Sequence, residues 1–121
     1  MAATNLMRNT ACALISLALL AGCASTLNSD SAPADWPELK VVTIIAPVDE
    51  MLAACTWNDV LLSDVACALI DFNRKLCTIV FRDDRPIVAS VMTHELGHCG
   101  GKDHPGEDTL RRAWEKWKSQ R

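Results

Sequence analysis

All three histidines of the 121-residue chain fall in one short stretch, HELGHCGGKDH. His94 and His98 are four residues apart, so on a helix both imidazoles lie on one face and can bind the same metal ion. Gly100 and Gly101 can end that helix and turn the chain back, because glycine tolerates positive φ. His104 is then the expected third ligand, and Zn²⁺ is the expected metal.

Three neutral imidazoles on Zn²⁺ leave one coordination position for water, which is typical of catalytic rather than structural zinc sites. Zinc lowers the pKa of such a water to roughly 7. Glu95, next to the first ligand, is placed to take a proton from this water as the water attacks a carbonyl. The pattern therefore predicts a zinc metallopeptidase that hydrolyses peptide bonds, with Glu95 as the general base and a peptide or protein as substrate.

The same stretch matches HExxHxxGxxH and so resembles the signature of the metzincin clan of zinc metallopeptidases at every fixed position. The resemblance implies that His94, His98 and His104 bind zinc, that Glu95 is the base and that Gly101 permits the turn. It also implies a zincin-like domain, here a minimal one.

The chain departs from the metzincin pattern, and it also lacks residues that many zinc peptidases use. Metzincins place a methionine turn downstream of the third histidine, whereas the last methionine here is Met92, upstream of it. The chain has no tyrosine and no fourth histidine to stabilise an oxyanion. That stabilisation would have to come from zinc, a backbone N–H, or a cation such as Arg82, Arg85 or Lys102.

Two other ligand assignments remain open. Asp103 can serve as the third ligand in place of His104, since aspartate fills that role in some related zincins, but His104 has the matching spacing. Cys99 can serve as a zinc thiolate, but it lies about 100° around the helix from His98.

The start of the chain resembles a bacterial lipoprotein signal peptide, predicted over residues 1–22. Arg8 precedes an apolar run from Ala11 to Ala21, which is too short for a permanent membrane span. Leu20-Ala21-Gly22-Cys23 resembles the lipobox, after which Cys23 carries lipid. The alternatives are an ordinary secreted protein cleaved nearby and a leftover anchor helix.

Residues 23–37 are predicted to be a lipidated N-terminus and flexible tether, because they are rich in Ser, Ala, Asp and Pro and lack apolar periodicity. Residues 38–121 are predicted to form one zincin-like metal-binding domain. Ala24 resembles the outer-membrane retention pattern, so we expect a lipid-anchored monomer in the cell envelope, facing the periplasm. The net charge of −3 without a basic stripe argues against nucleic acid as a partner.

Four cysteines follow Cys23, and an even number in a small exported chain predicts two disulfides. Three pairings are possible. The pairing favoured here joins Cys67 to Cys77 across a hairpin and leaves Cys55 to join Cys99.

The apolar patterns predict an α+β fold, with a small antiparallel or mixed sheet packed on the helix that carries the histidines, and a C-terminal helix. Strands are predicted over residues 39–45, 66–72 and 76–81. Helices are predicted over residues 48–57, from Pro86 to the glycines, and over 107–119. We expect the strand at 76–81 to lie at an edge, where it can hold an extended peptide.

Two helices show apolar stripes that predict their packing faces. In the helix that carries the histidines, the stripe facing the sheet comprises Val88, Met92, Leu96 and Cys99. In the C-terminal helix, the packing side comprises Leu110, Ala113, Trp114 and Trp117.

The alternative function is a non-catalytic zinc-binding envelope lipoprotein, with a structural, metal-capture or interaction role. Glu95 separates the two, because a purely structural site has no use for a base beside an open coordination position. A role in blocking a surface receptor fits the size of the chain, but no residue supports it.

Overall fold

Three strands and three helices make up the part of the chain that the computed structural model describes, residues 27–55 and 65–121. In chain order these are β1 (Lys40–Ala46), α2 (Val48–Cys55), β2 (Ala66–Asp71), β3 (Leu76–Arg82), α3 (Ala89–Cys99) and α4 (Thr109–Ser119). None of these helices has the length and apolar character needed to cross a membrane.

The strands form one mixed sheet in the order β1-β3-β2, with β3 parallel to β1 and antiparallel to β2. This confirms the predicted α+β fold and its hairpin. The prediction that β3 is an edge strand is wrong, because β3 pairs along both sides. Its run Ile79-Val80-Phe81 is buried, as expected of a strand that is covered on both faces.

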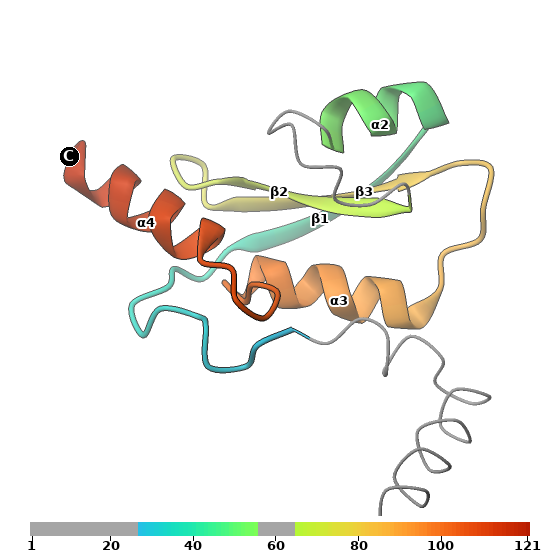
Figure 1. Ribbon diagram of the computed structural model, residues 1–121. Coiled ribbons are helices and arrows are strands. Elements are labelled where there is room, and N and C mark those ends of the chain that lie inside the picture. Colours follow the sequence, from blue (N-terminus) through green and yellow to red (C-terminus); the bar gives the residue numbers. More distant parts are fainter. Residues whose placement is uncertain (1–26, 56–64) are drawn as a thin grey trace, which may run out of the picture.

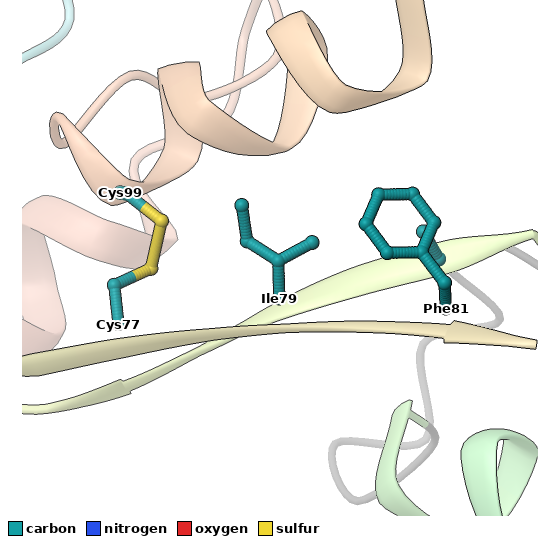
Figure 2. Close-up of a cluster of buried hydrophobic side chains, with 5 residues drawn as sticks. Cys77, Ile79, Phe81 and Cys99 are labelled. Atoms are coloured by element: carbon teal, nitrogen blue, oxygen red, sulfur yellow. A yellow bond between two sulfur atoms is a disulfide. The ribbon is translucent and has the colours of Figure 1, made fainter. Parts of the chain in front are cut away.

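Helices α2 and α3 lie on opposite faces of the sheet (Figure 1). Successive side chains of β3 point to opposite faces, so they divide the core into two clusters. The cluster on the α3 side contains Ala66, Cys77, Ile79, Phe81 and Cys99, and Figure 2 labels the last four. The cluster on the α2 side contains Met51, Cys55, Cys67 and Val80.

Each cluster contains one disulfide, Cys55–Cys67 on the α2 side and Cys77–Cys99 on the α3 side. The prediction of two disulfides is confirmed, but the favoured pairing is wrong. In the hairpin Cys67 lies opposite Val80, so Cys67 and Cys77 point to opposite faces of the sheet. Since Cys99 is disulfide-bonded, it is not a zinc thiolate.

The sheet-facing side of α3 is rotated relative to the predicted stripe. Met92 and Cys99 pack against the α3-side cluster as expected. Leu96 and Val88, however, are 43% and 50% exposed. Glu95, which is only 5% exposed, lies on the buried side of α3. The predicted stripe had only apolar residues on that side.

Some helix boundaries also differ from the prediction. Helix α3 begins at Ala89 rather than at Pro86, and α4 begins at Thr109, two residues later than expected. The last two residues of the predicted helix 48–57 lie outside the described residues.

An aromatic cluster joins α4 to the hairpin and to the N-terminal segment, residues 27–37. Trp114 is buried and stacks on Trp117, and Phe72, just after β2, contacts both rings and Trp36. The predicted packing role of the two α4 tryptophans is thus seen, whereas Ala113 is exposed.

The N-terminal segment is packed on the domain, contrary to the predicted flexible tether. The indole Nε1 of Trp36 donates a hydrogen bond to the carbonyl of Cys99 at 2.9 Å. Ser31 is 3% exposed, and its Oγ accepts a hydrogen bond from the N–H of Asp103. Because polar groups make these contacts, they produce no apolar periodicity in the sequence from which the packing could be predicted. Cys23 and the predicted signal peptide lie outside the described residues.

Peptide mapping without reduction tests the observed pairing. We expect crosslinked peptides for Cys55–Cys67 and Cys77–Cys99. Removing either pair by serine substitution should lower the unfolding free energy by about 2–4 kcal/mol, because each disulfide restricts the unfolded chain. The two loops, with sequence separations of 12 and 22 residues, should give similar losses. A peptide joining Cys67 to Cys77 would contradict the structure.

Candidate metal centre

The three histidines converge on one point. His94 and His98 come from α3, and His104 comes from the loop before α4. The Nε2 atom of His94 lies 3.1 Å from Nε2 of His104 and 3.2 Å from Nε2 of His98. Ligand atoms of a tetrahedral zinc with Zn–N distances of 2.0–2.1 Å lie about 3.3 Å apart. The spacing of the imidazole nitrogens therefore fits a single ion.

Two of the imidazoles are oriented by hydrogen bonds on their other nitrogen. His98 Nδ1 donates to the backbone oxygen of Lys102 at 2.7 Å, and His104 Nδ1 donates to Glu107 Oε2 at 3.0 Å. A carbonyl or an ionised carboxylate can only accept, so in the neutral form of either ring the hydrogen is on Nδ1 and Nε2 has the lone pair. Metal-binding histidines are typically oriented in this way.

Hydrogen bonds among the three imidazole rings cannot account for both short contacts of His94. Nε2 of His94 has at most one hydrogen, which it can donate to either His98 or His104 but not to both. The remaining short contact then has no hydrogen between its two nitrogen atoms, and a cation shared by lone pairs on all three rings would remove this unfavourable contact. Burial lowers the pKa of His98 to about 4, so this ring is neutral at pH 7 and available as a ligand. The donor set thus fits a metal ion.

No fourth His, Cys, Asp or Glu joins the group among the residues that the structure describes. The alternative ligand Asp103 is directed elsewhere: its carboxylate accepts a hydrogen bond from the N–H of Leu110, at the start of α4, at 3.1 Å. The structure therefore brings together the three predicted histidines and excludes Asp103 from the group. Three ligands leave a tetrahedral ion one position open.

Glu95 is buried directly beside the first histidine of the cluster. Burial raises the pKa of Glu95 to about 7. A carboxyl group with this pKa can both accept and donate a proton near neutral pH. Glu95 is not itself one of the grouped ligand residues.

The turn that returns His104 to the cluster depends on Gly101. Gly101 has φ +87°, as predicted, whereas Gly100 has φ −83° and ends the helix without a positive φ. The ring of Trp36 lies against Gly101, where an added Cβ would lie 2.6 Å from a ring carbon. This close approach adds a second reason for glycine at this position.

Several residues that hold the ligand loop were not anticipated. The N–H of Asp103 donates to Ser31 Oγ at 2.8 Å, and the N–H of Asn28 donates to the Asp103 carbonyl at 2.9 Å. Only Glu107, three residues after His104, had a spacing that could have suggested its role. Of the cations proposed for the oxyanion, Arg82 forms an ion pair with Asp84.

Comparisons of the chain with protein-family models, with curated proteins and with solved structures find no match. The chemistry of the centre is therefore inferred from its own residues.

Alanine at Gly101 should destabilise the protein more than alanine at Gly106. Both glycines have positive φ, which costs about 1–2 kcal/mol for alanine, but nothing lies within 4 Å of a Cβ at Gly106. Overlap with Trp36 should add about 1–3 kcal/mol at Gly101. Chemical denaturation measures both values, and equal losses would contradict the packing of Trp36 on the turn.

Removal of the Glu107 carboxylate should weaken metal binding. Loss of a hydrogen-bond partner of a ligating histidine typically costs 10–100-fold in metal affinity. Because Glu107 is partly exposed, we expect about tenfold for Glu107→Ala, measured by competition with a zinc chelator. Glu115→Ala removes an exposed carboxylate of α4 that pairs with Lys118 and should leave the affinity unchanged. The same affinity in both variants would exclude the orienting role.

Proposed function

We propose that this protein is a zinc-dependent metallopeptidase in which His94, His98 and His104 bind one Zn²⁺. One observation carries the proposal: Nε2 of His94 lies 3.1 and 3.2 Å from Nε2 of the other two histidines, near the spacing of tetrahedral ligands, with no fourth protein ligand in the described part of the chain. Hydrolytic zinc sites have this composition, whereas structural zinc sites usually have four protein ligands.

A bound zinc ion would supply Lewis acidity, which lowers the pKa of water and polarises a carbonyl group. The protein would supply the proton transfers. Glu95 would accept the proton of the attacking water and deliver it to the leaving nitrogen, a task suited to a carboxyl group with a pKa near 7. The match of residues 94–104 to the metzincin signature supports the same assignment.

The proposed setting is the bacterial cell envelope, with lipid on Cys23 and the domain facing the periplasm from the outer membrane. The lipobox-like sequence supports lipidation. The two disulfides, Cys55–Cys67 and Cys77–Cys99, fit an oxidising compartment.

The second candidate is a zinc-binding lipoprotein without catalysis. The burial of Glu95, which is 5% exposed on the sheet-facing side of α3, favours it, because a general base must reach water and substrate. The lack of tyrosine also favours the non-catalytic function, because no tyrosine hydroxyl can stabilise an oxyanion.

The variant Glu95→Gln separates the two functions. Under the peptidase proposal it should retain one zinc per chain and lose at least about 100-fold in casein cleavage, the usual contribution of a general base. The control Glu50→Gln, on an exposed position of α2, should keep both zinc and cleavage. Zinc content and cleavage are measured on the same preparations.

Two outcomes would contradict the assignments. A wild-type protein that binds one zinc and cleaves neither casein nor a peptide library would support the non-catalytic function. A His104→Ala variant with undiminished zinc affinity would exclude His104 as the third ligand.

A further inference from the structure

The solvent-facing side of α3 has no charged side chain. Its exposed residues are Ala89, Thr93 and Leu96. The other two helices of the described chain follow the usual pattern, in which exposed faces are charged. The exposed charged residues are Asp49 and Glu50 in α2, and Arg111, Arg112, Glu115 and Lys116 in α4.

This uncharged side is also aliphatic. Leu96 is 43% exposed, and Ile87 and Val88, at the N-terminal end of α3, are 42% and 50% exposed. An exposed apolar surface on a helix face that has no charges indicates a surface with a partner.

The N-terminal segment reaches the domain on this same side. Leu27 packs against Gly97 of α3, close enough that a Cβ at Gly97 would lie 2.4 Å from a Leu27 methyl carbon. Figure 1 shows the described chain beginning next to the face of α3 that is turned away from the sheet. Cys23 precedes Leu27 by four residues, which can span at most about 14 Å. A lipid on Cys23 would therefore hold this side of α3 at the membrane.

We propose that the outward face of α3, with Ile87, Val88 and Leu96, docks on the lipid surface of the membrane to which Cys23 is anchored. The side-chain carbons of Lys102 pass close to Gly97 on this face, so its ammonium group can reach the headgroups. The acidic residues of α2 lie on the opposite face of the sheet, away from the membrane (Figure 1). This surface rests on the proposed lipid anchor and not on catalysis.

Docking in this way defines where the metal centre works. His94 and His98 are each two positions from Leu96, so they lie about 160° around the helix from it. With Leu96 on the lipid surface, the metal centre would lie on the far side of α3, about one helix diameter, 10–12 Å, from the lipid. Its substrates would then be peptide segments held at about that distance from the membrane surface, which deepens the proposed peptidase function.

The test uses the mature lipoprotein, purified from bacterial membranes and placed in nanodiscs of phosphatidylethanolamine and phosphatidylglycerol. A fraction of the lipids has a nitroxide on the headgroup, and methyl NMR measures the broadening at each residue. We expect strong broadening at Leu96, Val88 and Ile87. Leu52, on α2, and Ile45, which is 61% exposed on β1, serve as internal controls and should show little.

A matched pair of variants tests the contact surface itself. Leu96→Glu should abolish the broadening at Val88 and Ile87 and leave the chemical shifts of the other methyl groups unchanged. Leu52→Glu should leave the broadening at Val88 and Ile87 intact. Broadening at Leu52 or Ile45 equal to that at Val88, or no broadening anywhere, would overturn the proposal.

Mass spectrometry of the mature N-terminus separates this proposal from the proposed function. The expected product is a lipid-modified Cys23. A chain without lipid would overturn the docking surface, whereas casein cleavage by the same preparation would still report on the peptidase. Absence of casein cleavage, together with the expected broadening at Leu96, Val88 and Ile87, would instead overturn the peptidase function alone.

Discussion

The structure depends on holding Nε2 of His94 3.1 Å from Nε2 of His104 and 3.2 Å from Nε2 of His98. Such a cluster does not stabilise itself without a cation, so the scaffold must fix each ring. Helix α3 fixes His94 and His98 through their i, i+4 spacing. His104 needs a tight turn at Gly101, and the Cys77–Cys99 disulfide ties the end of α3, from which that turn departs, to the central strand. One of the two disulfides of the described chain therefore lies next to the ligand loop.

Asp103 shows how closely this loop is connected to the rest of the protein. Its N–H donates to Ser31, its carbonyl accepts from Asn28, and its carboxylate accepts from the N–H of Leu110. One residue thus joins the ligand loop to the N-terminal segment and to α4. The aromatic cluster around Trp114 links the same two elements a second time. A residue that the sequence offered as an alternative ligand instead positions the neighbouring ligand.

Local patterns in the sequence predicted the strands, the helix that carries the histidines and the histidine triad, because β-branched runs and i, i+4 spacing act over a few residues. The disulfide pairing was not predictable in this way. It depends on which side of the sheet Cys67 and Cys77 face, and the hairpin register decides that. The buried position of Glu95 and the packing of Ser31 likewise depend on elements distant in sequence. Hydrogen bonds made by a Ser- and Pro-rich segment leave no periodic signal, so that segment resembled a tether.

X-ray absorption spectroscopy at the zinc edge, on the disulfide-intact mature protein loaded with one equivalent of Zn²⁺, tests the central claim most directly. Three imidazole nitrogens and one further light atom at about 2.0–2.1 Å are the predicted ligand shell. Imidazole multiple scattering should correspond to three rings. A sulfur shell at about 2.3 Å, or fewer than three imidazoles, would contradict a centre built from His94, His98 and His104 with one open position.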